Sequence, residues 1–496
     1  MANTSTIHIK TDFDCKVYDY GQEIGTTKAD TFCNFEFRKG EHELTFAFAE
    51  DESVSKTINY IVEDADCDYR LNVEIAESIS DKAKEQYDLK NYSKAYSLFS
   101  LVAMIGLAEA QCRLGNLFET GKGIEKDSLK AEEWYTKAAE QGNAEAMYSL
   151  GRLYCEQKND KAKAFHYFQL SSEKNHLETL VCLGCCYENG YGTEINLDKA
   201  IELTAKAAEQ DCARAKRIMG LYYENGTGVE MNTAKALEWY IKAAEQGDAS
   251  AQCSLGFHYK YGKGVDRDLV KAVEWYTMAA EQGFATAQNN LGNCYHGGTG
   301  VEKDLAKAVE WYNKAAEQGY ASAQYNLGLC YEEGDGVEKD IAKAVEWFLK
   351  AAEQGDANAQ CTLGLCYSYS KGVKHDPIKA FEWFTKAAEQ GNATAQFNLG
   401  ICYENGIGVN KDLPKAVKWY TLATEQGIIT SKDRIRRISI NKIATSATRK
   451  RSYSNPRGKS THRSYENLRR ETWDAMTDGM YGDYPGSVDD YSFLGY

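Results

Sequence analysis

Apolar residues recur at helical spacing in short blocks along most of the chain. In residues 248–261, Ala251, Leu255 and Tyr259 lie four positions apart, so they share one face of a helix. The same stripe returns 36 residues later and once more after that, as Ala287, Leu291 and Tyr295 and then as Ala323, Leu327 and Tyr331. Each such block predicts a first helix of a repeated unit.

A second helix is predicted after each first one. In residues 269–282, Ala272, Tyr276 and Ala279 form the packing stripe. A Gly-x-Gly-Val turn joins the two helices, and the residue before the second helix is Asp or Asn. These residue types cap a helix by accepting backbone N–H bonds. The predicted caps are Asp127, Asn196, Asn232, Asp268, Asp304, Asp340, Asp376 and Asp412.

A glycine preceded by Leu or Met stands inside each first helix, at 115, 151, 184, 220, 256, 292, 328, 364 and 400. Glycine inside a helix costs about 1 kcal/mol relative to Ala, so nine copies require a compensating gain. We expect that gain to be close approach of the neighbouring helix. The step is 36 residues throughout, except for 33 between Gly151 and Gly184. Residues 155–160 lack Gly-x-Gly there, so we expect a tighter connection and not a broken array.

The full pattern is Ala-x-x-x-Leu-Gly-x-x-Tyr, Gly-x-Gly-Val and then Lys-Ala-x-x-Trp-Tyr-x-Lys-Ala-Ala-Glu-Gln-Gly. It resembles the Sel-one-like repeat, a relative of the tetratricopeptide repeat; one copy covers 323–331, 334–337 and 343–355. The resemblance implies a right-handed superhelix of antiparallel helix pairs, with the first helices on the concave face. It also implies adaptor or scaffold work in protein complexes. Some family members bind peptides, and some bacterial ones were linked to cell-wall or β-lactam chemistry.

The predicted fold is therefore mainly α, a right-handed α-solenoid of nine units over 108–429. Residues 1–74 alternate like strands, as in Leu44-Thr45-Phe46-Ala47-Phe48, and predict a small β-sandwich that weakly resembles a PEGA-type domain. Residues 75–107 predict a degenerate helix pair that caps the array. Its apolar face would comprise Tyr87, Tyr92, Ala95, Leu98 and Phe99.

Residues 430–496 predict a flexible tail after a short closing helix that would use Ile435, Ile438 and Ile443. Residues 432–470 carry a net charge of +11, and the residues from 471 onward contain six acids and no base. The basic part is a solvated tether or, alternatively, binds nucleic acid or an anionic surface. The acidic end would be a linear recognition tail or only a solubilising end. Its candidate contacts are Trp473, Tyr481, Tyr484, Phe493 and Tyr496.

The face of each first helix opposite its packing stripe is predicted to line a peptide-binding groove. It comprises the positions six and three before the repeated glycine and one and four after it, which differ between units while the packing positions do not. Aromatic and aliphatic side chains there offer anchor area, and Asn offers hydrogen bonds to an extended peptide. The candidates are Phe257, Lys260, Asn289, Asn293, His296, Tyr325, Leu329, Glu332, Leu365, Phe397, Ile401 and Glu404. Replacing Tyr325 and Phe397 together with Ala would abolish partner capture; the alternative is that these are ordinary surface residues.

The cysteine pattern and the hydropathy of the chain favour a reducing, aqueous compartment. The chain has 15 Cys, and Cys294, Cys330, Cys366 and Cys402 recur at one equivalent position, as small buried thiols would. The sequence holds no apolar run long enough for a membrane span and no signal-peptide pattern at its start. We therefore expect a cytoplasmic location.

No catalytic constellation is apparent, so we expect a binding scaffold without cofactor or metal, whose partner is an unidentified protein or peptide. The 8 His residues are scattered and fit no metal motif. Cys182, Cys185 and Cys186 cluster and leave a metal or redox role as an alternative. The repeated Gly-x-Gly lacks the strand–turn–helix context of a phosphate loop. The alternative function is hydrolysis of cell-wall or β-lactam compounds, which the family resemblance implies.

Overall fold

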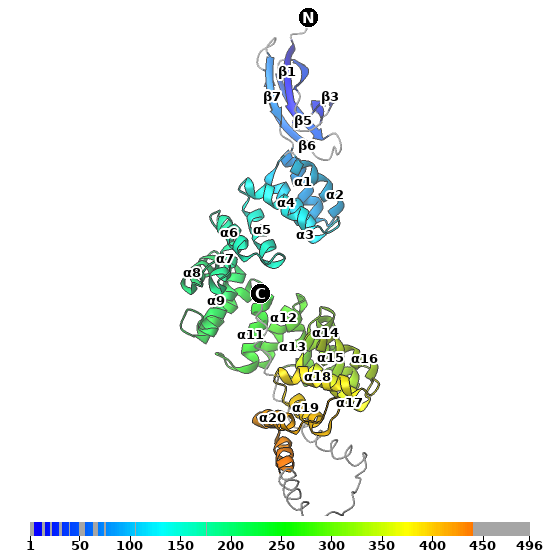
Figure 1. The fold of residues 1–496 in the computed structure, drawn as a ribbon. Coiled ribbons are helices and arrows are strands. Elements are labelled where there is room, and N and C mark those ends of the chain that lie inside the picture. Colours follow the sequence, from blue (N-terminus) through cyan, green and yellow to red (C-terminus); the bar gives the residue numbers. More distant parts are fainter. Residues whose placement is uncertain are drawn as a thin grey trace, which may run out of the picture. The chain divides into compact units, whose positions relative to one another are not determined.

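Along the sequence, a β-rich region comes first and a series of helix hairpins follows it (Figure 1). The computed structural model describes residues 4–11, 15–19, 22–28, 32–38, 40–48, 55–62, 68–73, 76–104, 106–174 and 176–439. The chain separates into two compact units, Met1–Ala251 and Gln252–Tyr496, which are called the N-terminal and the C-terminal unit below.

Seven strands occupy the described part of residues 4–73. They are β1 (Thr4–Thr11), β2 (Cys15–Asp19), β3 (Gln22–Thr27), β4 (Phe32–Arg38), β5 (Gly40–Phe48), β6 (Ser55–Val62) and β7 (Asp68–Val73). One sheet has the order β4-β1-β7, in which β1 and β7 run parallel, and the other has the order β3-β2-β5-β6, which is antiparallel throughout. The described residues between 4 and 73 thus form two sheets, in contrast to the helical repeats that follow. The sandwich packing and the PEGA resemblance stay predictions.

A helix pair precedes the repeats, α1 (Ala76–Asp88) and α2 (Tyr92–Met104). Leu98 and Phe99 are buried in it. The rings of Tyr87 and Tyr92 meet edge to face, with centroids 5.2 Å apart.

Nine hairpins follow, and they are numbered here as repeats 1 to 9. Their first helices are α3 (Ala108–Thr120), α5 (Ala144–Glu156), α7 (Leu177–Asn189), α9 (Ala213–Asn225), α11 (Ala249–Tyr261), α13 (Ala285–Gly297), α15 (Ala321–Glu333), α17 (Ala357–Tyr369) and α19 (Ala393–Asn405). Their second helices are α4 (Ser128–Glu140), α6 (Lys161–Ser172), α8 (Leu197–Glu209), α10 (Thr233–Glu245), α12 (Leu269–Glu281), α14 (Leu305–Glu317), α16 (Ile341–Glu353), α18 (Pro377–Glu389) and α20 (Leu413–Glu425). Within each unit a second helix packs both on its own first helix and on the next one, which makes a solenoid. The handedness of a superhelix stays a prediction.

The repeated glycines sit where the two helices of a hairpin approach most closely, as predicted. A Cβ built on Gly256 would lie 2.6 Å from the ring of Tyr276, and one on Gly328 would lie 2.5 Å from the ring of Phe348. The same clash with an aromatic ring of the second helix recurs in every repeat except repeat 3, where Gly184 faces Thr204. The absent side chain therefore makes room for a buried ring, which offsets the helical cost of glycine.

The predicted caps are also confirmed. Each of the eight Asp and Asn residues accepts a backbone N–H bond from the first turn of its second helix. In repeat 2 the turn is shortened as expected, because only residues 157–160 connect α5 to α6. Asn159 takes a left-handed φ of 51° there, and Asp160 caps α6.

A further helical segment covers residues 429–439 and closes the array, as the apolar spacing predicted. Ile438 is buried with Phe397 and Ile401 of α19, and Ile435 packs against the same cluster. Ser431, which stands 36 residues after the buried Ala395, is fully buried as well. The segment thus takes the place of a next first helix. Ile443 lies outside the described residues.

The cysteines that recur in the last repeats are part of this packing. Cys294, Cys330, Cys366 and Cys402 are free thiols and buried. Burial raises the pKa of Cys330, Cys366 and Cys402 to about 12 in each case. A thiol with so high a pKa stays protonated and unreactive, so this column serves packing.

None of the helices in the described part of the chain combines the length and the apolar character that a membrane span requires.

Candidate functional site

The surface of interest is the first-helix face, defined as the positions six and three before the repeated glycine and one and four after it. Phe257, Lys260, Asn293, His296, Tyr325, Leu329 and Leu365 are each partly accessible, and Asn289, Glu332, Phe397 and Ile401 are buried. The face that was predicted to be open is therefore partly occupied by contacts between successive repeats.

Asparagines on this face join repeats 6 and 7. The amide nitrogen of Asn326 on α15 donates to the side-chain oxygen of Asn289 at 2.9 Å and to that of Asn293 at 3.4 Å, both on α13. Asn293 also accepts a bond of 2.7 Å from the hydroxyl of Tyr312. Because both side-chain oxygens accept a bond from Asn326, Asn289 and Asn293 link α13 to α15, and these oxygens are already engaged.

An apolar column remains at the position after the repeated glycine. Phe257, Leu329 and Leu365 occupy it in repeats 5, 7 and 8, and all three are half-buried. The ammonium group of Lys263 lies 4.5 Å from the centre of the Phe257 ring. Tyr325, three residues before its glycine, packs with its ring centre 5.6 Å from that of Phe348. These side chains are ordered by their neighbours and keep part of their apolar surface in water.

Phe397 and Ile401 differ from the rest because the closing segment lies on them. Their exposed fractions are 4% and 5%, and Ile438 belongs to the same cluster. Below them, Arg434 lies 3.5 Å from the carboxylate of Glu404, which also accepts a bond of 2.6 Å from Tyr420. In this structure Phe397 and Ile401 therefore stabilise the end of the array and are not exposed to a partner.

The side chain four residues after the repeated glycine is likewise paired with a neighbouring side chain. Glu332 is paired with Lys371 of the next repeat, and His296 lies 3.2 Å from Asp335. In repeat 1, Glu119 accepts a bond of 2.7 Å from Tyr135 and one of 3.1 Å from Arg152 of repeat 2. Burial, followed by the charge of Glu119, raises the pKa of Tyr135, so its hydroxyl remains a donor. These carboxylates are structural acceptors.

A glutamine ladder that the sequence reasoning missed links the repeats. Gln288, four residues before its glycine, donates to the carbonyl of Ala280 in the preceding repeat at 3.1 Å and accepts from Gln318 of its own repeat at 2.7 Å. Gln324 repeats this arrangement with Ala316 and Gln354. The signal was the recurrent Ala-x-Ala-Gln. In repeats 2, 3 and 4 the same position holds Met147, Leu180 and Lys216.

No catalytic or metal arrangement emerges from the described residues. Within them, no group of three or more His, Cys, Asp or Glu side chains is placed to hold a metal ion. Burial raises the pKa of Cys185 to about 11 and that of Cys186 to about 12, so neither is an activated thiolate.

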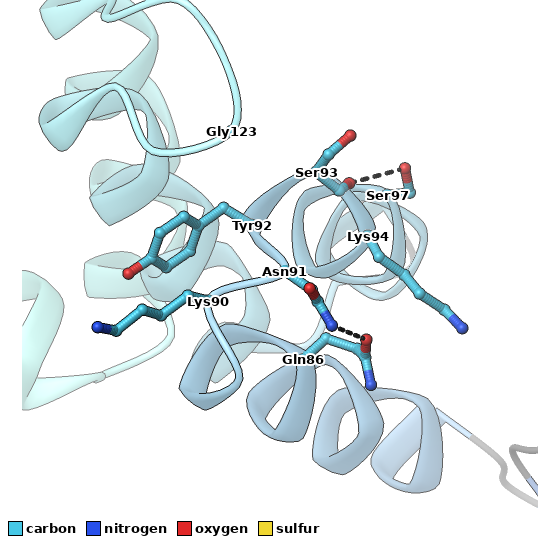
Figure 2. Close-up of a pocket in the computed structure, with 8 residues that line it drawn as sticks. All are labelled: Gln86, Lys90, Asn91, Tyr92, Ser93, Lys94, Ser97 and Gly123. Atoms are coloured by element: carbon cyan, nitrogen blue, oxygen red, sulfur yellow. Dashed lines mark hydrogen bonds between the residues drawn. The ribbon is translucent and has the colours of Figure 1, made fainter.

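A shallow hollow of about 590 Å³ lies beside the turn between α1 and α2, and Figure 2 shows its lining. Lys90 and Lys94 extend away from its floor, where Asn91 donates to Gln86 at 3.1 Å. Ser97 donates to the carbonyl of Ser93 at 3.2 Å. The polar groups are thus bonded to one another, and nothing converges on a ligand.

The proposed recognition residues Trp473, Tyr481, Tyr484, Phe493 and Tyr496 lie outside the described residues, as does most of the basic stretch 432–470.

Successive helix hairpins, joined through one constant face of each first helix, define the class of this protein: it is an α-solenoid repeat protein. The sequence pattern of the Sel1 repeat family matches this chain nine times, at residues 108–143, 144–176, 183–212, 213–248, 249–284, 285–320, 321–356, 357–392 and 393–428. These nine segments cover well over half of the chain, which therefore belongs to the Sel1 repeat family.

Curated relatives are similar to part of this chain. DAP3-binding cell death enhancer 1 of Rattus norvegicus is 36% identical over 179 residues, which are 28% of this chain and 35% of that protein. ERAD-associated E3 ubiquitin-protein ligase component HRD3A of Arabidopsis thaliana is 33% identical over 67 residues, 14% of this chain and 10% of that protein. The chain spans about a third or less of the length of these relatives.

Solved structures are similar as well, and two of them are described here. The Sel1 repeat protein from Oxalobacter formigenes is 35% identical and is matched over 62% of this chain and 90% of that chain, with a TM-score of 0.48. The antigen c5321 of uropathogenic Escherichia coli, described as displaying an SLR fold, is 29% identical over 74% of this chain and 99% of that chain, with a TM-score of 0.37.

Proposed function

We propose that the protein is a non-enzymatic scaffold of the cytoplasm that binds a peptide or protein segment along the first-helix face of the C-terminal unit. Sel1 repeat proteins generally serve as protein-interaction scaffolds. The names of the relatives from rat and Arabidopsis, one DAP3-binding and one a ligase component, agree with work in assemblies. Binding by this chain is our inference.

The observation that carries the proposal is the apolar column of Phe257, Leu329 and Leu365. The packing positions of the same helices are nearly invariant between repeats, whereas this column varies in side chain and keeps apolar surface accessible. Ordered, half-exposed apolar residues at one equivalent position of repeats 5, 7 and 8 suit an extended partner that buries them one after another. Lys260 beside them would supply a polar contact at the rim.

The test uses a phage-displayed library of random dodecapeptides, selected on the full-length protein. The variant Leu329→Ala with Leu365→Ala removes two side chains of the column. Losing two Leu contacts should weaken the selected peptides that are rich in apolar residues by at least about tenfold in fluorescence anisotropy.

The matched control is Val270→Ala with Ile378→Ala, since both residues are exposed on second helices. It should bind within about twofold of wild type, because a surface side chain outside the interface contributes little. Equal loss in control and variant, or no loss in either, would refute this site, and melting curves establish that each variant is folded.

A further inference from the structure

Arginines gather on the first helices of the N-terminal unit, although the chain as a whole has a net charge of −15. Arg152 lies on α5, and Arg214 and Arg217 lie on α9. The equivalent helices of the C-terminal unit carry no arginine on α13, α15, α17 or α19. The cluster is thus a local departure from the repeat pattern, on the variable face.

The charges of Arg152 and Arg214 both influence the same two side chains, Tyr148 and Cys182. The Nη1 atom of Arg214 lies 4.0 Å from the sulfur of Cys182 on α7, and the Cζ atom of Arg152 lies 5.9 Å from the ring centre of Tyr148 on α5. Burial raises the pKa of both Tyr148 and Cys182, while the charges of both arginines oppose that rise. Arg152 and Arg214 therefore project a positive potential onto one spot, formed by Tyr148 and Cys182.

Within this cluster, Arg214 differs from Arg152 and Arg217 because it has no acidic partner among the described residues. Arg152 lies 3.1 Å from Glu119 and 3.5 Å from Glu156, and Arg217 lies 3.4 Å from Asp248.

Among the described residues, no carboxylate comes within 4.0 Å of Arg214, whose one hydrogen-bond partner is the Cys182 thiol. Thiols are weak acceptors, and a guanidinium carries five N–H donors. A half-buried arginine with spare donors has lost water without gaining an anion.

Three acids on α5 and α7, the helices that carry Tyr148 and Cys182, are already engaged. Glu145 accepts from His176 at 2.8 Å, and Glu178 lies 3.8 Å from the same ring. Glu188 accepts a bond of 3.0 Å from the hydroxyl of Tyr222. None of these three carboxylates neutralises Arg214, so an anion from outside the chain would meet an uncompensated charge.

We propose that Arg214, beside Tyr148 and Cys182, forms a carboxylate-binding subsite on the first-helix face of the N-terminal unit, and that its occupant is an acidic side chain of a peptide bound on that unit. The inference rests on the proposed scaffold function, extends it from the C-terminal to the N-terminal unit, and names the chemistry of the ligand. The planar guanidinium fork of Arg214 matches a carboxylate in two parallel hydrogen bonds. Tyr148 offers an aromatic surface for the adjoining peptide residue, and Arg152, itself paired with Glu119 and Glu156, lies with its Cζ atom 5.9 Å from the centre of that ring.

The test repeats the dodecapeptide selection on three full-length proteins at low salt: wild type, Arg214→Gln and Arg113→Gln. Arg113 is the matched control, because it lies on the first helix α3, is half-exposed and lies 4.0 Å from Glu109. Wild type should enrich peptides containing Asp or Glu. Their affinity should fall about tenfold or more for Arg214→Gln, as the loss of a charge-assisted pair requires, and within about twofold for Arg113→Gln. Arg214→Glu should select Lys- or Arg-containing peptides.

Three outcomes would overturn the subsite. Selected peptides that lack acidic enrichment contradict its charge, and peptides that bind wild type and Arg214→Gln equally contradict its location. Equal losses for Arg214→Gln and Arg113→Gln show a general charge effect. In all three the protein still binds peptides, so the proposed function survives. If wild type enriches no peptide at all, the proposed function fails and the subsite fails with it.

Discussion

At the scale of residues, the repeat depends on a pair: a glycine in the first helix and a ring in the second. Gly328 lets the ring of Phe348 lie flat against α15, and Gly256 does the same for Tyr276. The pair explains why glycine persists where helical propensity opposes it. Where the ring is Tyr420, its hydroxyl crosses to the first-helix face and donates to Glu404.

Gly328→Ala tests this pairing. The new Cβ would lie 2.5 Å from Phe348 and 3.2 Å from the carbonyl oxygen of Ala344, so we expect a lower urea midpoint. Overpacking costs about 1–3 kcal/mol, and the better helical propensity of Ala returns about 1 kcal/mol of it. In a Phe348→Ala background the same change should be close to neutral. Equal destabilisation in the two backgrounds would show that the ring is not the cause.

The sequence predicted the glycine's role but not the side-chain network around it. Spacing shows that Gly256 and Tyr276 recur together, and a cost repeated nine times pointed to close approach. It does not show that Gln288 reaches a carbonyl of the preceding repeat, because that contact depends on how neighbouring hairpins are offset. For the same reason Asn289 was interpreted as a groove residue, although it bonds to Asn326.

At the scale of elements, each hairpin is fixed by its cap and turn, and repeat 2 is the exception. Its shortened turn is followed by α6 and then by α7, which begins after His176 without a side-chain cap. His176 instead bonds to Thr179 at 2.9 Å and to Glu145 of α5 at 2.8 Å. A histidine thus joins repeats 2 and 3, where the glutamine ladder is interrupted.

This contact should make the junction sensitive to pH. The hydrogen bond to Glu145 raises the pKa of His176 above its usual 6.5, against the opposing effect of burial. A raised pKa in the folded state means that the stabilisation is fully present below pH 6.5 and is lost as the pH rises through the folded-state value. His176→Gln should therefore lower the melting midpoint at pH 6 and have little effect at pH 9. The pair should contribute at most about 1 kcal/mol.

His166→Gln is the control, since His166 is an exposed histidine on α6. It should leave the difference between pH 6 and pH 9 unchanged. A loss for His176→Gln that is the same at both pH values would show that its ring contact with Tyr148, 4.9 Å between centres, matters more than its charge.

The segment 429–439 covers apolar side chains of the last hairpin. Ile438 is buried against Phe397 and Ile401, whereas its neighbour Ser439 is exposed. Ile438→Asp should release the segment, because a buried carboxylate without a partner is costly, and the lost contacts are worth about 2–5 kcal/mol. Exposed apolar surface would then bind the dye ANS more strongly. Ser439→Asp should not change ANS fluorescence; equal changes in the two variants would contradict the packing of Ile438.

At the scale of the whole molecule, the number of repeats and their helices could be predicted from the sequence because each repeat obeys the same local rules. The groove stays a prediction. The sequence places the variable positions on one face of each first helix, and the structure shows that neighbouring repeats and the closing segment cover several of them. Arg214 was not singled out, since an arginine without an acidic partner is visible only when all surrounding carboxylates are placed.

The direct test of the central claim is site-specific photo-crosslinking to a peptide selected on wild type. A photoreactive phenylalanine analogue replaces Leu365 on the first-helix face of α17 in one protein and Ile378 on α18 in another. A peptide bound along the first-helix face should crosslink at position 365 and not at position 378, with unlabelled peptide competing the product away. Crosslinking at 378 with none at 365 would contradict the claim that this solenoid binds its partner through its first helices.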